Sequence, residues 1–163
     1  MEIRKVTAAD DWSAIGNIYA ASWKEAYRGI VPQRYLDRLL GDQWLPIFQN
    51  DTLESYVLLK NEQYIGTSAI CAARDEKMAG WGELVSIYLL PEYFGKGCGA
   101  PLLTHATNAL FEKGFQHVYL WVLQANRRAQ KFYEQQDFYP NGDTCSIEIE
   151  GKKLTEIRYV KTL

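Results

Sequence analysis

Residues 83–100 read ELVSIYLLPEYFGKGCGA, and they predict a buried strand, a glycine-rich loop and the start of a helix. Residues 83–90 carry apolar side chains on both faces, as is typical of a strand at the centre of a covered sheet. Pro91 ends this strand, and three alternating glycines follow it. Unshielded backbone N–H groups at 95–100, together with the positive end of the helix dipole, favour a phosphate or pyrophosphate. Lys96 adds a positive charge nearby.

Two alternative roles of the glycine loop stay open on these residues alone. Glycines of this kind also make a tight strand-to-helix turn that binds nothing. A Walker A loop requires G-x-x-x-x-G-K-[ST], and no such string occurs in the chain. The spacing is GxGxG and not GxGxxG, and the antiparallel strands expected at the end of the chain do not suit a doubly wound dinucleotide fold. A nucleotide-binding domain is therefore a less favoured alternative.

Outward from this stretch, strands and helices alternate in a mixed order. The pattern predicts one α/β (α+β) domain over residues 1–163, with a mostly antiparallel sheet, a central parallel strand–helix–strand unit and helices on both faces. The expected elements are a strand at 2–6, a helix capped by Thr7 and ended by Gly29, a helix from Pro32 with Tyr35, Leu36, Leu39 and Leu40 on one face, a short helix at 44–48, a hairpin of 55–60 and 64–74, a helix at 102–113, a strand at 117–123, a helix at 126–136, and strands at 144–150 and 153–161 that turn at Gly151.

Composition and charge exclude several classes of protein. The 163 residues have a formal net charge of −2 and a pI near 5.7, whereas a nucleic-acid-binding surface needs a basic excess. The N-terminus has no apolar signal-peptide region, and no stretch reaches the roughly 18 apolar residues of a membrane span. The three scattered cysteines indicate neither a disulfide framework nor a zinc site. We expect a cytoplasmic protein without metal, nucleic-acid partner or membrane association.

Two further patterns connect the chain to a known family. Residues 94–99 resemble the [QR]-x-x-G-x-[GA] loop of the GNAT (GCN5-related N-acetyltransferase) superfamily, with Phe94 at the Gln/Arg position. Residues 120–134, LWVLQANRRAQKFYE, resemble the family's strand-Asn-x-x-A-x-x-F-Y segment. Residues 22–32, SWKEAYRGIVP, look like a segment of bacterial small-molecule members. The order of elements is similar to that of the family along the whole chain.

The resemblance implies that acetyl-CoA is the co-substrate. Its pyrophosphate would lie on the amides of the glycine loop, and its pantetheine arm would pair with the backbone of the central strand. The strands at 83–90 and 117–123 would separate to admit the thioester, whose carbonyl a backbone N–H near Leu89 would polarise. Asn126 would contact the pantetheine, although it also suits a helix N-cap. The implied cofactor-binding residues are Ile87, Tyr88, Leu89, Phe94, Gly95, Lys96, Gly97, Cys98, Gly99, Ala100, Asn126 and Ala129.

Acyl transfer to an amine requires a proton for the departing thiolate. Tyr133 is the candidate donor, because a phenol pKa of about 10 exceeds the roughly 8.5 of a thiol. Asn126, Ala129 and Tyr133 fall on one helical stripe, where the small Ala129 leaves room for a cofactor chain. A core aromatic beside Phe132 is the alternative role of Tyr133. Glu83 is the candidate base, acting directly or through water, and a solvated strand-end carboxylate is its alternative.

The first helices contain the candidate acceptor pocket. Trp23, Tyr27 and Tyr35 would wall it, and Glu25 and Asp37 would attract a cationic amine. For most of these aromatic residues the helical spacing favours core packing instead.

We therefore expect an enzyme, an acetyl-CoA-dependent N-acetyltransferase. It would move an acetyl group to a primary amine of a small molecule or peptide by direct transfer in a ternary complex. The alternative is a catalytically silent CoA-binding regulatory module on the same fold. Exposed C-terminal strands would permit a homodimer.

Overall fold

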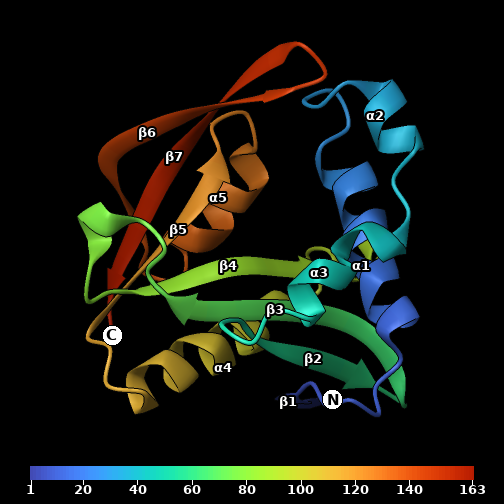
Figure 1. Cartoon of the computed structure of the whole chain (residues 1–163), viewed down its shortest axis with the longest axis horizontal. Helices are drawn as coiled ribbons and strands as arrows, with labels where there is room; N and C mark the ends of the chain where they lie inside the picture. Colours follow the sequence, from blue (N-terminus) through green and yellow to red (C-terminus); the bar gives the residue numbers. More distant parts are fainter.

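The computed structural model describes all 163 residues and contains one seven-stranded sheet (Figure 1). The strands are β1 (Glu2–Lys5), β2 (Glu54–Lys60), β3 (Gln63–Ala72), β4 (Gly82–Leu89), β5 (His117–Leu123), β6 (Tyr139–Ile149) and β7 (Lys152–Thr162). They lie in the order β1-β2-β3-β4-β5-β7-β6, and only the β4–β5 pair is parallel. The predicted fold class, a mostly antiparallel sheet around a parallel strand–helix–strand unit, is confirmed.

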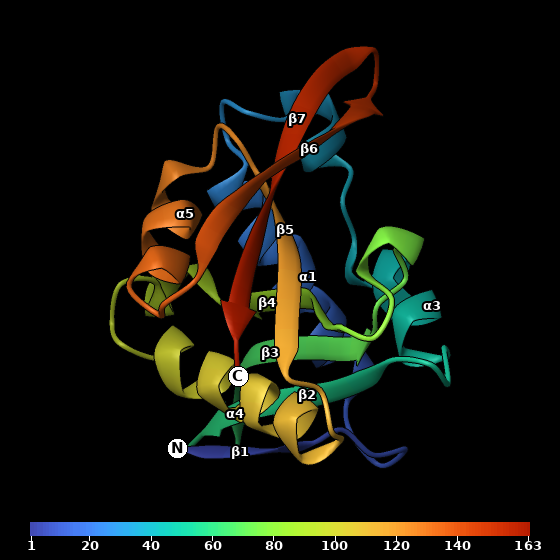
Figure 2. The same ribbon diagram turned by 90° about the vertical axis from the view of Figure 1, so that its left-hand side faces the viewer.

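Helices cover both faces of this sheet, as Figures 1 and 2 show. The α-helices are α1 (Trp12–Ala26), α2 (Gln33–Asp37), α3 (Leu45–Phe48), α4 (Gly99–Glu112) and α5 (Arg127–Glu134), and the 3-10 turns are η1 (Gly41–Trp44), η2 (Glu76–Met78) and η3 (Pro91–Tyr93). On one face, Leu103 of α4 shares an apolar cluster with Leu120 of β5. On the other, Tyr19 of α1 shares a cluster with Val57 of β2. No helix has the length and apolarity that crossing a membrane demands.

The first helix has a different N-cap from the predicted one. Asp11 caps α1, because its carboxylate accepts a hydrogen bond from the Ala14 N–H at 3.0 Å. Thr7 donates its own N–H to the Asp10 carboxylate at 2.7 Å and so belongs to the preceding turn. The prediction of Thr7 was therefore wrong, and α1 also ends before Gly29.

The second helix is shorter than its apolar pattern suggested. Leu36 and Leu39 are buried, but Leu40 is 63% exposed, so the predicted common face of four apolar residues was wrong. Beyond the end of α2 at Asp37, Gly41 packs against Gly16 of α1. A Cβ on Gly16 would come within 2.3 Å of the Gly41 carbonyl oxygen, so only two glycines allow this approach.

A β-bulge shapes the central strand β4. Leu84 and Ser86 each pair with a residue of β3, whereas Val85 between them has no partner. The extra residue places Leu84 and Ser86 on opposite faces: Leu84 joins the cluster under α4, and the Ser86 hydroxyl bonds to that of Tyr19 of α1 at 2.9 Å. A bulge also bends its strand, which turns the second half of β4 away from the line of its neighbour.

The tip of the β6–β7 hairpin is tied to the region of α2, beside which it lies in Figure 1. Glu150 at the hairpin turn forms ion pairs with Arg34, at 2.6 Å, and with Arg38. Lys152 donates a hydrogen bond to the carbonyl of Ile30 at 2.5 Å. These contacts hold the hairpin over the end of the sheet where α1 and α2 lie.

Candidate functional site

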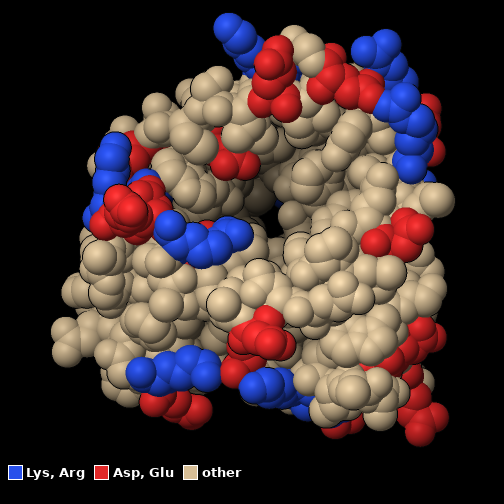
Figure 3. All heavy atoms as spheres, in the orientation of Figure 1, with Lys and Arg blue, Asp and Glu red and all other residues tan.

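The parallel strands β4 and β5 separate soon after they meet. Only Gly82 with Val118 and Glu83 with Tyr119 are paired, and the bulged part of β4 then diverges from β5. A cavity of about 810 Å³ lies in the gap. It is lined by β4, β5, α5 and the glycine loop, and on its other side by α1 and the β6–β7 hairpin. Figure 3 shows the hollow near the centre of this face. The predicted separation of the two strands is thus confirmed.

The glycine loop between β4 and α4 presents free amides. Gly95 and Gly97 have φ angles of 69° and 77°, in the left-handed region that glycine enters without steric cost. A Cβ at either position would meet no atom within 4 Å, so the space beside them is open. The backbone N–H groups of Gly95, Gly97, Cys98, Gly99 and Ala100 donate no hydrogen bond within the protein. Because they cluster at the N-terminus of α4, they form a site for an anion.

Five of the seven predicted loop residues line the cavity. These are Phe94, Gly95, Gly97, Gly99 and Ala100. The side chain of Lys96 is exposed and outside the lining. Cys98 is buried in an apolar cluster with Leu102. Lys96 and Cys98 therefore adjoin the cavity through their backbone alone.

Phe94 has an aromatic ring where the family loop carries Gln or Arg. A cation from α5 lies over this ring. The guanidinium carbon of Arg128, in the first turn of α5, lies 3.9 Å from the centre of the Phe94 ring. Arg128 also lines the cavity. Burial lowers the pKa of Arg128, although a guanidinium stays charged at neutral pH. The stack thus holds a positive charge beside the glycine loop.

Helix α5 places the predicted stripe on the cavity, because Asn126, Ala129 and Tyr133 all line it. Asn126 is the N-cap of α5, and its side-chain oxygen accepts the Ala129 N–H at 3.2 Å. Asn126 therefore does act as a helix N-cap, which was its alternative role. The amide nitrogen of its side chain makes no hydrogen bond inside the protein.

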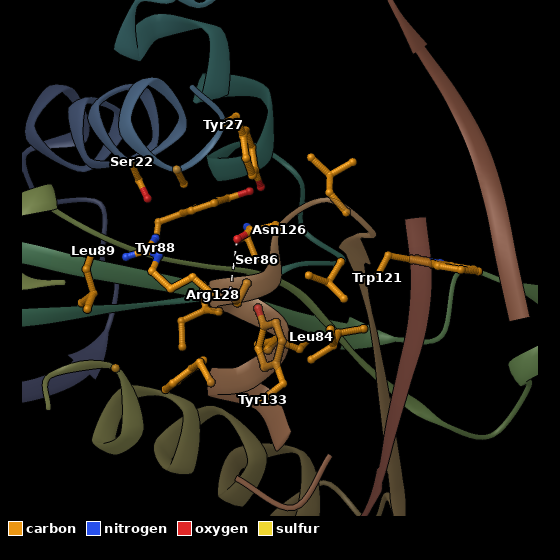
Figure 4. Close-up of a pocket in the computed structure, with 18 of the residues that line it drawn as sticks. Ser22, Tyr27, Leu84, Ser86, Tyr88, Leu89, Trp121, Asn126, Arg128 and Tyr133 are labelled. Carbon is orange, nitrogen blue, oxygen red and sulfur yellow. Dashed lines mark hydrogen bonds between the residues drawn. The ribbon is translucent and has the colours of Figure 1, made fainter. Parts of the chain in front are cut away.

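The Tyr133 ring is packed, but its hydroxyl is not bonded. The ring contacts those of Phe132, Phe138 and Tyr159, with centroids 5.4, 5.9 and 6.3 Å away. The hydroxyl makes no hydrogen bond and points into the cavity in Figure 4. Burial raises the pKa of Tyr133 above its ordinary value, so the phenol keeps its proton at neutral pH. A fixed ring with a protonated, unbonded hydroxyl has the features of a proton donor.

The edge of β4 that faces the gap carries the predicted residues Ile87, Tyr88 and Leu89, all in the cavity wall. The Leu90 N–H bonds to the Ile65 carbonyl of β3 at 2.9 Å. Because successive N–H groups of a strand point to opposite sides, that of Leu89 points into the gap. The Tyr88 side chain extends across the cavity, and its hydroxyl lies beside that of Tyr27 (Figure 4).

Glu83 lies where β4 and β5 part, and its carboxylate is fully engaged. Arg74 binds it through its guanidinium, at 2.6 Å for the nearest pair of atoms, and through its backbone N–H at 3.0 Å. The Tyr119 hydroxyl donates a third contact at 2.8 Å. Burial raises the pKa of Glu83, but these bonds outweigh burial and leave the pKa below its ordinary value. Such a carboxylate accepts a proton poorly, so its surroundings do not support the expected role as base.

We expect Arg74→Met to lower the free energy of unfolding by about 1–2 kcal/mol at pH 7, because it removes the partner of a buried carboxylate. The loss stays modest because Arg74 itself is half-exposed and solvent screens the pair. The lowered pKa of Glu83 stabilises the fold above the unfolded value of about 4.3, and this stability is lost as the pH falls. Urea unfolding at pH 7 and pH 3.5 should show the loss shrinking at the lower pH. Arg28→Met, at an exposed pair with Glu25, is the control. An equal loss at both pH values would contradict the assignment.

The predicted acceptor residues divide into two groups. Trp23 and Tyr27 line the cavity. Tyr35 packs against Trp23, with ring centroids 6.5 Å apart, but lies outside the lining. Glu25 forms an exposed ion pair with Arg28, and Asp37 accepts a hydrogen bond from Gln33. Neither acid reaches the cavity, so the expectation that they attract the amine there was wrong.

Sequence reasoning missed several residues of the wall. Arg128 and Trp121 lie within the family-like segment, but nothing in their spacing distinguished them from surface and core residues. The β6–β7 hairpin contributes Ile147, Ile149 and Glu156. Nothing in the sequence singled out Glu156, because only the sheet order, with β7 beside β5, shows that its face of the strand borders the gap.

Comparison with known proteins gives consistent matches. Residues 12–138 match the sequence pattern of the family described as "Acetyltransferase (GNAT) family". The chain is 28% identical over 151 residues to the uncharacterized N-acetyltransferase YuaI of Bacillus subtilis, with 91% of this chain and 86% of the relative covered. It is 25% identical over 162 residues to a spermidine N(1)-acetyltransferase of Thermoplasma acidophilum, with 94% and 97% covered.

Solved structures share the fold. The crystal structure of the PaiA N-acetyltransferase of Thermoplasma acidophilum, in complex with coenzyme A, superposes with a TM-score of 0.76 at 22% identity. The superposition covers 99% of this chain and 98% of that one.

Proposed function

Because the chain belongs to the GNAT acetyltransferase family and is an N-acetyltransferase, we propose that it moves an acetyl group from acetyl-CoA to a primary amine of a small molecule by direct transfer in a ternary complex. One observation carries the proposal. The gap between β4 and β5 has free amides at one end and the unbonded Tyr133 hydroxyl in its wall. This arrangement suits two partners that are bound in one cavity at the same time and meet beside a proton donor.

The residues at the loop end of the gap fit coenzyme A. The free amides of Gly95, Gly97, Cys98, Gly99 and Ala100 would be donors for the pyrophosphate. The open space beside Gly95 and Gly97 would let it approach the backbone. The free edge of β4 at 87–89 suits the amide groups of the pantetheine arm, and the Asn126 side chain suits the same arm from α5.

The stack of Arg128 on Phe94 suggests a contact to the same pyrophosphate. We expect Arg128→Met to weaken acetyl-CoA binding about 10- to 100-fold, since a hydrogen bond to a charged group is worth about 1.5–3 kcal/mol. Calorimetric titration with acetyl-CoA measures the change. Arg127→Met, on the next residue of α5, is the matched control and should bind nearly as tightly as the wild type. Equal affinities of the Arg128 variant and the wild type would show that this cation is not part of the coenzyme site.

The chemistry follows from the wall of the gap. Bound acetyl-CoA supplies a thioester carbonyl and a thiolate leaving group. The Leu89 N–H, which points into the gap, would donate to the carbonyl oxygen as it develops negative charge. The neutral amine attacks the carbonyl carbon, the carbon–sulfur bond breaks, and Tyr133 gives its proton to the sulfur. The proton released from the amine nitrogen returns to Tyr133 through water, so the enzyme ends as it began.

The acceptor is proposed to be a small amine, because a relative that aligns over nearly the whole chain acts on spermidine. The first test measures the release of CoA from acetyl-CoA in the presence of spermidine. The second measures the melting temperature with acetyl-CoA, ATP or NAD, because a ligand that binds only the folded state raises it. Stabilisation by acetyl-CoA together with amine-dependent CoA release supports the proposal. Stabilisation with no CoA release with any amine would instead favour a CoA-binding regulatory module. Stabilisation by ATP or NAD alone would favour a nucleotide-binding domain.

A further inference from the structure

The cavity contains a carboxylate that no cation neutralises. Glu156 lies in β7, in register with Leu123 of β5, and lines the cavity at the end formed by α1 and the β6–β7 hairpin. It takes part in no ion pair of the structure, and its one side-chain hydrogen bond comes from the Cys145 thiol at 3.5 Å. It is half-buried. A carboxylate in such surroundings is costly unless a cation or strong donors accompany it.

Two arginines near this part of the cavity have carboxylate partners of their own. Arg74 is bound to Glu83. Arg158, two residues from Glu156 on the same face of β7, is bound to Asp75 and stacks on the rings of β5. Neither forms an ion pair with Glu156, so the negative charge of Glu156 is available to a ligand.

Aromatic side chains surround this end of the cavity. Trp23 of α1 lines the cavity. So do Tyr27 at the C-cap of α1, Tyr88 of β4 and Trp121 of β5, which are labelled in Figure 4. Burial, with a contribution from the charge of Glu156, raises the pKa of Tyr27 to about 12, so its phenol stays neutral. The faces of such rings attract cations. A carboxylate within an aromatic wall is the combination that proteins use to bind ammonium groups.

We propose that Glu156 binds the positive charge of the acceptor amine, and that the cavity thereby selects small cationic amines. This inference rests on the proposed function, because it assigns the acceptor end of the same gap. A bound ammonium would neutralise Glu156, which the protein itself leaves unpaired. It would also place the acceptor beside α1 and the β6–β7 hairpin, whereas the free amides of the glycine loop lie at the N-terminus of α4.

The test compares Glu156→Gln with the wild type, using spermidine as the acceptor. The variant keeps the shape of the side chain and removes its charge. We expect the KM for spermidine to rise about 10- to 100-fold, as for a lost hydrogen bond to a charged group. The KM for acetyl-CoA and the kcat at saturating spermidine should stay within about threefold. Glu156→Asp restores the charge and should recover part of the lost affinity.

Glu148→Gln is the matched control, because Glu148 lies on the same hairpin but is exposed and outside the cavity. An unchanged spermidine KM in Glu156→Gln, with the wild type active, would overturn the role of Glu156 and leave the proposed function standing. A parallel loss of melting temperature and of acetyl-CoA affinity would assign Glu156 a structural role and also overturn the inference. A wild type that binds acetyl-CoA but acetylates no amine would overturn the proposed function itself.

Discussion

Replacing Tyr133 by phenylalanine is expected to lower kcat about 100- to 1,000-fold, within the range that a positioned general acid contributes. The ring would stay packed between Phe132, Phe138 and Tyr159, so the fold and the cavity should persist. Affinity for acetyl-CoA, measured by calorimetry, should change less than threefold. The difference between the two measurements separates a role in proton transfer from a role in packing.

Two further measurements sharpen the assignment of Tyr133. Tyr139→Phe removes a phenol that is 56% exposed, and it should leave kcat unchanged. Because burial raises the pKa of Tyr133, the wild type should show no loss of kcat from deprotonation of this residue up to about pH 10. Full turnover in Tyr133→Phe would show that the sulfur receives its proton from another source.

Replacing Gly97 by alanine is expected to weaken acetyl-CoA binding about 100-fold, corresponding to the loss of one or two hydrogen bonds to a charged group. With φ at 77°, a side chain strains the backbone by about 1–2 kcal/mol and shifts the amides. The added methyl group would also occupy the open space beside the loop. The apparent dissociation constant can be measured by calorimetric titration.

The matched control for this substitution is Gly80→Ala. Gly80 has a φ of 87° and open space around it, but lies away from the cavity. Both variants should therefore lose a similar amount of stability, while only the Gly97 variant loses affinity for acetyl-CoA. Equal acetyl-CoA affinities in the two variants would mean that the glycine loop does not hold the coenzyme.

The cofactor end of the site could be predicted from the sequence because it depends on local patterns. Glycines between a buried strand and a helix, and the stripe from Asn126 to Tyr133, are set by periods of two and 3.6 residues. The succession of strand, helix and strand through 83–123 follows from the same patterns, and the family resemblance added the separation of β4 and β5. Each of these features lies within one continuous stretch of chain, between 83 and 134.

The acceptor end could not be predicted in the same way, because it depends on contacts between distant segments. Glu83 is the second residue of β4, but its partner Arg74 comes from the β3–β4 connection, and no spacing rule predicts that pair. Glu156 reaches the cavity only because β7 lies next to β5 in the sheet. Thr7 failed as a cap for a local reason, because α1 begins only at Trp12 and the Asp11 side chain caps it.

The most direct test of the account is the initial rate of CoA release by the wild-type protein, with acetyl-CoA and spermidine varied together and the acetylated product counted by mass spectrometry. The account predicts release that depends on the amine, one acetylated spermidine for each CoA, and rates that require both partners to be bound at once. Release of CoA before any amine is added, with the acetyl group left on the protein, would contradict direct transfer across the gap between β4 and β5.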